Sequence, residues 1–484
     1  MNGGALALHM DKYEINMAYA HWLHGTHRKR AVFELYFRKL PFGNGFAVFA
    51  GLERVVDYLL TLRFDEEDIR YLREQEEAYR EPFLDELRRF RFTGDLFAMR
   101  EGTIVFPNEP LLRVEASVFE AQLIETALLN FVNFQTLIAT KAARIKRTSP
   151  GDTFLEFGSR RAQEADAAIW GARAAYIAGF DATSNLLAGK RFGIPTAGTH
   201  AHSWVQAHDS ELEAFERYAE ALPDQVTLLV DTYDALALGV PHAMEIAKRL
   251  EARGKRMRAI RIDSGDLAAQ AKAARAMLDE AGLGYVRIVA SNDLDEHVIL
   301  HLKAQGAPID SWGVGTKLIT GGEESALGGV YKLVARETDD GWQPVIKISG
   351  NAEKTVTPGA KTAYRLIRAD TGRAAADALA FPSEDEVRGG MATVFIDPSD
   401  PLQQREIDRY EAVPLLTPVV AHGELRAEGL PDLHAIREHH AAELQLFAPE
   451  HMRALHPEPY PVWLTERVWN LKADMIRRYR SPRP

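Results

Sequence analysis

The chain of 484 residues is long enough for about two or three domains, and its apolar content of 46% and charged content of 26% are ordinary for a globular protein. Its net charge of −11 argues against nucleic acid as the main partner, so any anionic ligand must be bound by a local cluster of Arg, Lys and backbone N–H groups. The sequence contains no cysteine, which excludes disulfides, thiolate catalysis and cysteine metal sites.

Residues 1–11 have no basic segment followed by a long apolar core, and no apolar run in the chain approaches the ~20 residues of a membrane span. We therefore expect a cytoplasmic protein.

Residues 1–150 are expected to form a mixed α+β domain that ends in a long helix. Apolar spacing and β-branched or aromatic runs predict helices over 15–23, 47–60, 64–91 and 118–146, and strands over 31–37, 96–106 and 111–114.

From residue 153 the pattern changes to short apolar runs that end in polar residues and are followed by helical segments. These runs predict strands over 153–157, 194–197, 226–230, 258–262, 286–290 and 311–314. Polar clusters at the carboxyl ends of nearly all the strands are typical of the active site of a (β/α) barrel. An open doubly wound sheet is the alternative, but it would use only the ends near its switch point. We therefore predict an α/β fold with an irregular (β/α) barrel over residues 151–328.

The sequence after the predicted barrel returns to strand-like patterns. Residues 329–386 are expected to form a β segment that returns to the N-terminal domain, so that one α+β domain is built from two separate parts of the chain. Residues 387–484 have a Pro-rich and Arg-rich end and are expected to form a smaller C-terminal appendage. No solenoid-type repeat and no low-complexity tract is present in the sequence.

Two histidines, His200 and His202, follow the predicted strand 194–197. Side chains at positions i and i+2 share a face only while the backbone is extended, so the two rings point together in a strand and apart once a helix has begun. Imidazoles at a strand end can be metal ligands, acid–base groups or nucleophiles. The simpler alternative is a pair of surface histidines in a loop.

Other strand ends carry residues suited to a phosphorylated sugar and a flat ring. Asp263 and Asp266 flank a turn after residues 258–262, where carboxylates can bind ribose hydroxyls or a hydrated Mg²⁺, although such a turn can also be no more than a helix cap. Phe157 and Arg160 supply an aromatic face and a guanidinium. Small residues around 291–293 and 313–316 can direct backbone N–H groups at an anion, or can simply form tight turns.

Together these motifs resemble the nicotinate phosphoribosyltransferase family, which are type II phosphoribosyltransferases. The resemblance runs in order over about residues 8–365 and includes Asp11-Lys12-Tyr13, Phe33-Glu34-Leu35-Tyr36-Phe37-Arg38, Pro41-Phe42-Gly43, Glu156-Phe157-Gly158-Ser159-Arg160-Arg161-Ala162-Gln163, Gly179-Phe180-Asp181-Ala182-Thr183-Ser184-Asn185, Gly198-Thr199-His200-Ala201-His202-Ser203, Arg261-Ile262-Asp263-Ser264-Gly265-Asp266, Ser291-Asn292, Gly313-Val314-Gly315-Thr316 and Leu327-Gly328-Gly329-Val330-Tyr331-Lys332-Leu333-Val334.

The resemblance implies the formation of nicotinate mononucleotide and pyrophosphate from nicotinate and phosphoribosyl pyrophosphate in NAD salvage, coupled to ATP hydrolysis, with Mg²⁺ as cofactor. It implies that His202 becomes phosphorylated and that Asp231 orients its ring, whereas His200 matches a variable position and receives no essential role. It also implies a homodimer with shared active sites, in which Tyr13 reaches the site from the second subunit. No nucleic acid and no membrane is expected as a partner.

The remaining site residues follow from the same resemblance. Thr199, Arg261 and Tyr13 match positions that contact nicotinate, and Phe157 is expected to stack on the pyridine ring. The positions that match the phosphoribosyl site are Arg160, Asp263, Ser291, Asn292, Gly315 and Thr316. The candidates for pyrophosphate contacts are Arg38, Lys332 and Lys354, and those for Mg²⁺ are Asp263 and Asp266.

Several alternatives stay open. The first is a nicotinamide-using relative of the same fold, for which Ser184 stands where we would expect a carboxylate. A quinolinate phosphoribosyltransferase lacks the phosphorylated histidine and needs more cations. A metal hydrolase would need further histidines at the later strand ends, which carry Asp, Ser and Gly instead. The non-enzyme alternative is a ligand-sensing paralogue, against which the intact His202 and Asp231 argue.

Overall fold

The computed structural model describes residues 6–350 and 354–480, and the chain divides into two compact units. The first unit contains residues 1–140 and 326–484, and the second contains residues 141–325. The divisions expected from the sequence lay at 150/151 and 328/329. Within the described ranges no helix combines the length and hydrophobicity that crossing a membrane requires.

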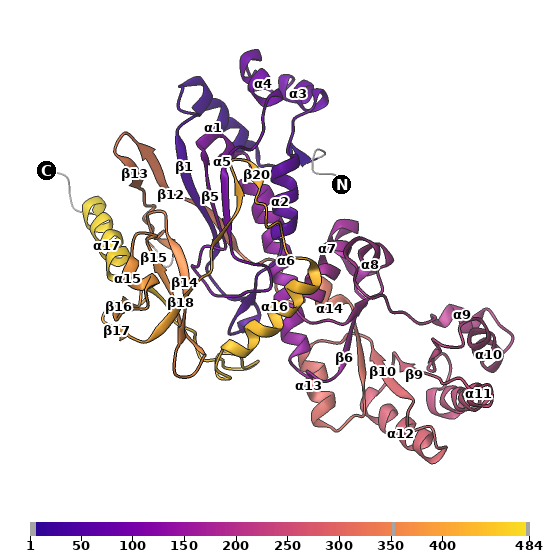
Figure 1. Ribbon diagram of the computed structural model, residues 1–484. Coiled ribbons are helices and arrows are strands. Elements are labelled where there is room, and N and C mark those ends of the chain that lie inside the picture. The colour runs from indigo at the N-terminus through magenta and orange to yellow at the C-terminus, as the bar shows by residue number, and fades with distance from the viewer. Residues whose placement is uncertain (1–5, 351–353, 481–484) are drawn as a thin grey trace. The chain divides into compact units, whose positions relative to one another are not determined.

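The first unit is built on a seven-stranded sheet, which Figure 1 shows with β1, β5 and β12 side by side. Its order is β13(Gly341–Pro344), β12(Gly329–Thr338), β1(Arg30–Phe37), β5(Leu112–Ser117), β3(Asp95–Ala98), β19(Thr417–Ala421) and β20(Glu424–Leu425). The apolar run of β1 is buried from Ala31 to Phe37, as expected for a central strand. Because β1 pairs with both β5 and β12, the segment after residue 328 does return to the N-terminal strands.

Helices of the N-terminal segment accompany this sheet. They are α1(Lys12–Leu23), α2(Leu52–Thr61), α3(Glu66–Arg73), α4(Glu81–Arg88), α5(Val118–Gln122) and α6(Glu125–Lys146). The helix predicted over 118–146 is therefore two helices. Ser117 and Glu120 form a reciprocal capping box that starts α5, and the polar side chains thereby satisfy N–H groups that the first helical turn leaves unpaired. A short pair, β2(Ala47–Val48) and β4(Ile104–Val105), completes the N-terminal segment.

A second, six-stranded sheet of the same unit is formed by the C-terminal part of the chain. Its order is β17(Gln404–Ile407), β16(Thr393–Ile396), β21(Val462–Thr465), β15(Ala374–Ala380), β14(Thr362–Arg368) and β18(Tyr410–Pro414). The helices here are α15(Asp385–Arg388), α16(Leu433–Leu446) and α17(Glu466–Arg480). The segment 387–484, expected to be an appendage, thus contributes strands to both sheets, because β19 pairs with β3 and β18 pairs with β14.

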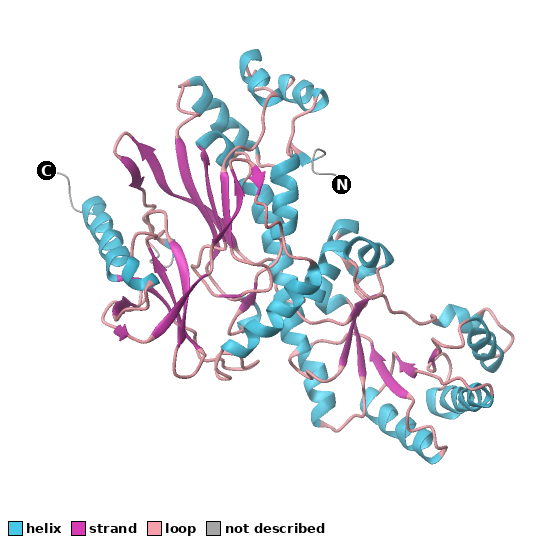
Figure 2. Cartoon of the chain, in the orientation of Figure 1, coloured by secondary structure: helices cyan, strands magenta, loops and turns pink. Residues whose placement is uncertain are grey.

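The second unit is a parallel sheet with helices between its strands, which Figure 2 colours magenta and cyan. The order is β7(Ala182–Thr183), β6(Thr153–Glu156), β11(Ser311–Val314), β10(Arg287–Ser291), β9(Ala259–Ile262) and β8(Thr227–Leu229). The connecting helices include α7(Glu164–Ile177), α8(Leu186–Phe192), α9(His202–Gln206), α10(Glu211–Ala221), α11(Val240–Ala252), α12(Leu267–Glu280), α13(Glu296–Ala304) and α14(Thr316–Ile319).

The predicted parallel βα units are confirmed, but the predicted barrel closure is not. β7 and β8 are the edge strands of the sheet, and the strand expected over 194–197 is reduced to one parallel bridge between Thr183 and Thr196. Pro195 has no backbone N–H and Gly198 follows the segment directly, so the segment is poorly suited to form a full ladder. Across the described residues the sheet is therefore an open, barrel-like arrangement of parallel strands.

A buried ionic cluster joins the C-terminal helix α16 to the second sheet of the first unit. Arg365 on β14 donates two hydrogen bonds to Asp377 on β15, at 3.0 and 2.7 Å, and a third to Glu443 on α16. Both Arg365 and Asp377 are almost completely buried. Burial and the neighbouring Asp377 carboxylate also raise the pKa of Glu109 well above its ordinary value.

We expect Arg365→Met to lower the free energy of unfolding by about 3–5 kcal/mol, because it leaves the buried carboxylates without their cation. Chemical denaturation measures this loss. The matched control is Arg368→Met on the same strand, whose ion pair with Asp370 is exposed, and it should leave the stability nearly unchanged. Equal effects of the two substitutions would contradict the buried cluster as a source of stability.

Candidate active site

The carboxyl ends of four strands of the second unit surround a cavity of about 120 Å³. Phe157 and Arg160 follow β6, Asp263 follows β9, Asn292 follows β10, and Gly315 follows β11. Of the site residues predicted in this unit, the cavity brings together Phe157, Arg160, Arg261, Asp263, Ser291, Asn292, Gly315 and Thr316, and it adds Arg161, Asp293 and Gly313. The strand-end clusters of the sequence therefore converge in space.

Arg261 is the centre of this cavity. Its Nε donates to Ser291 Oγ at 2.7 Å, one terminal nitrogen donates to Thr199 Oγ1 at 3.0 Å, and the other donates to Asp263 Oδ1 at 2.8 Å. The guanidinium carbon also lies 5.6 Å from the centroid of the Phe157 ring. A planar cation beside an aromatic face is suited to a flat ring that bears a carboxylate.

Two local features of the backbone shape the cavity. A Cβ atom on Gly313 would lie 2.7 Å from Phe157 Cδ2, so the glycine makes room for the aromatic ring. After β10, Asn292 and Asp293 adopt φ values of 93° and 41°, which side chains of L-residues rarely tolerate. Such conformations concentrate where a structure positions groups for a ligand, and they present this turn to the cavity.

The two histidines of the sequence motif diverge because α9 begins at His202. His200 is buried, and its Nε2 accepts a hydrogen bond from the backbone N–H of Leu229 on β8 at 3.1 Å. Since Nε2 is the acceptor, Nδ1 carries the proton and donates to Ala201 O at 3.3 Å. Burial lowers the pKa of His200, and the neutral ring has a structural contact at the edge of the parallel sheet.

His202 instead lies beside two carboxylates. Its side chain is 40% exposed, and its Nε2 is 3.9 Å from Asp231 Oδ1 and 4.0 Å from Asp263 Oδ2. Asp231 Oδ2 accepts hydrogen bonds from the N–H of Asp263 at 2.8 Å and from Ser264 Oγ at 2.7 Å. Its buried Oδ1 has no hydrogen-bond partner among the described residues. The predicted His202–Asp231 neighbourhood is present, but without a direct hydrogen bond.

Two residues that contact the site were not among the site residues predicted from the sequence. Thr232 Oγ1 lies 3.2 Å from His202 Nδ1 and is its hydrogen-bond partner. Glu156, buried on β6, accepts hydrogen bonds from Gly158 N–H and from Thr183 Oγ1, and so stabilises the turn that carries Phe157. Both stand within the strand-end clusters that the sequence analysis identified, but only their spatial neighbours distinguish them from other polar residues there.

The two carboxylates proposed for Mg²⁺ are in different environments. Asp266 is exposed and caps α12 by accepting from Ala269 N–H at 3.0 Å. Asp263 uses Oδ1 for Arg261 and Ser291 and directs Oδ2 toward His202. In the described ranges no group of three or more acidic, His or Cys side chains is arranged to hold a metal. Asp263 Oδ2 still fits a Mg²⁺ that retains water and substrate oxygens as its other ligands.

The other predicted contacts belong to the first unit. Tyr13 on α1 is 46% exposed and hydrogen-bonds Glu125, and burial together with this carboxylate raises its pKa. Lys332 Nζ on β12 is 3.9 Å from a Glu125 oxygen, and burial lowers the pKa of Lys332. Arg38 lies close enough to contribute to this lowering, whereas Lys354 is exposed. Glu125 thus joins Tyr13 and Lys332, and no sequence motif had identified Glu125 as a site residue.

Three family models match the chain. They are the N-terminal domain of nicotinate phosphoribosyltransferase over residues 8–133, the nicotinate phosphoribosyltransferase family over 153–379 and its C-terminal domain over 360–472. The nicotinate phosphoribosyltransferase of Bacillus subtilis is 50% identical over 479 residues, which cover 99% of this chain and 96% of that protein. The human nicotinate phosphoribosyltransferase is 33% identical, with 95% and 94% covered. The crystal structure of human nicotinic acid phosphoribosyltransferase superposes with a TM-score of 0.83 at 31% identity, covering 96% of this chain and 99% of that one.

We expect His200→Leu to destabilise the fold by about 1–3 kcal/mol, because the N–H of Leu229 would lose its buried acceptor. The matched control, His202→Leu, should leave the stability close to that of the wild type. The pH dependence follows from the lowered pKa of His200. When the pH is lowered through the ordinary value of 6.5, the His200 ring takes up a proton in the unfolded chain before it does so in the folded chain. The stability of the wild type should therefore decrease more steeply on acidification than that of His200→Leu. Parallel pH profiles in denaturant titrations would contradict this assignment.

Proposed function

Because the chain belongs to the nicotinate phosphoribosyltransferase family, we propose that it catalyses the formation of nicotinate mononucleotide and pyrophosphate from nicotinate and phosphoribosyl pyrophosphate in NAD salvage. The observation that carries this proposal is the placement of Arg261, which contacts Thr199, Ser291 and Asp263 beside the ring of Phe157. We also propose that the parallel sheet and the Thr183–Thr196 bridge act as an irregular barrel around this cavity.

The chemistry of the transfer matches these residues. The ribose gains oxocarbenium character as its bond to pyrophosphate breaks, and negative charge develops on the leaving group. Phe157 would hold the pyridine ring in line with the sugar, and Arg261 with Thr199 would bind the carboxylate of nicotinate. The ribose and its phosphate would be bound by Asp263, Ser291 and Asn292, together with Arg160, Gly315 and Thr316.

Charge on the pyrophosphate needs a further counter-ion. Mg²⁺, when bound with the substrate, would supply positive charge to the leaving oxygens. Asp263 would be its protein ligand, whereas the helix-capping role of Asp266 makes that residue the weaker candidate. Arg38, Lys332 and Lys354 remain proposed pyrophosphate contacts, and Arg160 lines the cavity itself.

We propose that ATP hydrolysis is coupled to this reaction through His202. Asp231, whose Oδ1 lies 3.9 Å from Nε2, favours the tautomer of His202 that carries its proton on Nε2 and leaves the lone pair on Nδ1. Nδ1 would attack the γ-phosphorus of ATP, so that a nitrogen–phosphorus bond forms and ADP leaves. Thr232, now bonded to Nδ1, would have to release it first. Hydrolysis of the phosphohistidine would then return phosphate and the free ring.

A direct assay tests the proposed transfer. Purified protein should form mononucleotide from nicotinate in preference to nicotinamide, and ATP should stimulate the reaction. Arg261→Ala and Asp263→Ala should each lower the rate at least about tenfold, since a lost contact to a charged group typically costs ~1.5–3 kcal/mol. The control is Arg258→Ala, whose exposed side chain, among the described residues, bonds only the carbonyl of Asp224. Preference for nicotinamide would select the alternative enzyme, and absence of turnover would select the ligand-sensing paralogue.

The two histidines can be separated by labelling. Incubation with γ-labelled ATP should give an acid-labile, base-stable label that His202→Ala abolishes and His200→Ala retains. His202→Ala should keep some ATP-independent synthesis, because the proposed ribose and nicotinate contacts remain, but should lose the stimulation by ATP. A label that persists in His202→Ala and disappears in His200→Ala would identify the other histidine as the acceptor.

A homodimer with shared sites is the last part of the proposal. The exposed Tyr13 on α1 would enter the site of the second subunit, whose Asp263 would bind the sugar. Mixed dimers of Tyr13→Ala and Asp263→Ala chains should therefore recover part of the activity that each homodimer lacks, because one of the two sites is intact. Failure to recover activity in verified heterodimers would mean that each site is built from one chain.

A further inference from the structure

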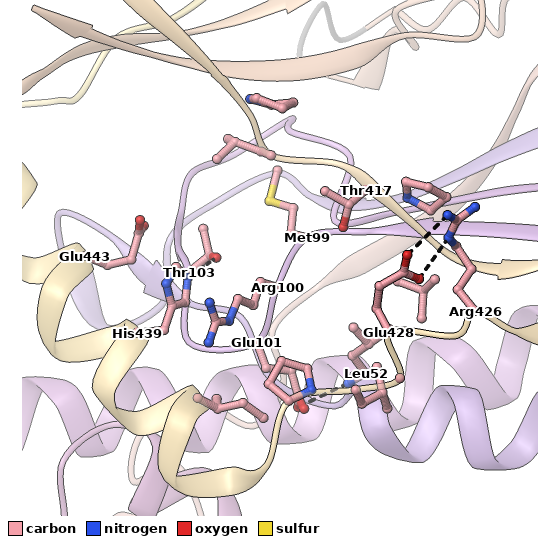
Figure 3. A pocket seen from close by; sticks show the side chains of 18 of the residues that line it. Leu52, Met99, Arg100, Glu101, Thr103, Thr417, Arg426, Glu428, His439 and Glu443 are labelled. Carbon is pink, nitrogen blue, oxygen red and sulfur yellow. Dashed lines mark hydrogen bonds and ion pairs between the residues drawn. The ribbon is translucent and has the colours of Figure 1, made fainter.

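Another cavity, of about 500 Å³, lies in the first unit, and none of the proposed catalytic residues lines it. It lies between the loop that follows β3, the segment after β18 and helix α16, as Figure 3 shows from close by. Its volume is within the range of pockets that bind small molecules, which is about 300–1,000 Å³. Segments from the two ends of the sequence therefore enclose a space of ligand size.

Most of the wall is apolar. Leu52 lies at the start of α2, Met99 follows β3, Leu415 follows β18, and Ile436 lies on α16. Val419 and Leu430 continue this lining. A body of aromatic or aliphatic carbon would be removed from water there, which is favourable by about 25 cal/mol per Å² of apolar surface.

One cation of the cavity has no counter-ion. Arg100 makes a single side-chain hydrogen bond, to the carbonyl oxygen of Ala435 at 3.1 Å, and no ion pair within the described parts of the chain. The other arginine, Arg426, is paired with Glu428 at 3.3 Å. A guanidinium with free donors is suited to bind a planar carboxylate through two parallel hydrogen bonds.

The group beside Arg100 is a neutral histidine. Figure 3 shows the Arg100 side chain directed toward His439 and Thr103. The distance from His439 Nε2 to Thr103 Oγ1 is 2.9 Å. Burial and the charge of Arg100 lower the pKa of His439 to about 4. At neutral pH this ring adds polar groups but no second positive charge.

The carboxylates of the cavity limit the charge of a ligand. Glu101 is buried and accepts hydrogen bonds from the N–H groups of Gly51 and Leu52, and Glu443 is paired with Arg365. Both lie in the wall of the same cavity, so a dianion would meet repulsion that a single guanidinium does not offset. The charges therefore favour a ligand with one negative charge.

We propose that this cavity binds a small monocarboxylate with an apolar body, its carboxylate on Arg100 and its carbon skeleton against Met99, Leu415 and Ile436. The site is separate from the catalytic residues proposed above and does not depend on the assigned reaction. Nicotinate has too polar a ring to be the best occupant, since most of the wall is apolar.

The test is isothermal titration calorimetry of the full-length protein with naphthoate and octanoate. At least one should bind saturably, and naphthalenemethanol, which has the same ring system without the charge, should bind at least about tenfold more weakly than naphthoate. Arg100→Gln should weaken the carboxylate by at least about tenfold while keeping the thermal stability and the mononucleotide-forming activity of the wild type. The matched control, Arg426→Gln, should bind as the wild type does.

Several outcomes would overturn the proposal. They are absence of binding by both carboxylates, equal binding of the alcohol, and an unchanged affinity in Arg100→Gln. Displacement by saturating nicotinate would place the probe in the catalytic site instead. An equal loss in Arg426→Gln would show that a diffuse positive field, rather than Arg100 itself, attracts the anion.

Discussion

The candidate active site depends on a chain of polar contacts that starts at one guanidinium. Arg261 on β9 binds Ser291 at the end of β10, Thr199 in the loop after the Thr196 bridge, and Asp263, which directly follows β9. Asp263 in turn donates its N–H to Asp231, which follows β8. The strand ends are therefore held by hydrogen bonds between side chains and loops, beyond the reach of the sheet ladder. This arrangement keeps the charged groups partly buried and at fixed separations before any substrate binds.

The same region explains why His200 and His202, two positions apart, have different environments. β8 is an edge strand of the sheet, and the segment around Thr196 makes its single bridge to Thr183. The N–H of Leu229 on β8 therefore needs another acceptor. The ring of His200 accepts that hydrogen bond, and the chain then turns into α9. An i, i+2 pair could face one cavity only in extended backbone. Because the helix begins at His202, one ring stays in the interior and the next reaches the carboxylates of the site.

These details mark the limit of what the sequence could predict. The strand ends with Arg261–Asp263, Ser291–Asn292 and Gly315–Thr316 were recognisable, because each apolar run stops at small or charged residues. Thr232 and Glu156 were not, since their importance comes from the atoms they contact across the sheet. The loss of the strand over 194–197 was equally hidden. Whether a short extended segment forms a ladder or one bridge depends on its neighbours, and those are far away in the sequence.

The C-terminal segment shows the same dependence on distant partners, and its interactions make it part of the first unit. β21 lies between β15 and β16, and β19 extends the sheet of β3, so removal of this segment would expose edges of both sheets. Glu443 on α16 also supplies one of the two carboxylates that bind the buried Arg365. Helix α16 also brings Glu443 and His439 to the wall of the cavity of about 500 Å³ in the first unit. A helix held in place by a buried ion pair can keep a polar group at a fixed position in an apolar wall, which is what a selective binding site requires.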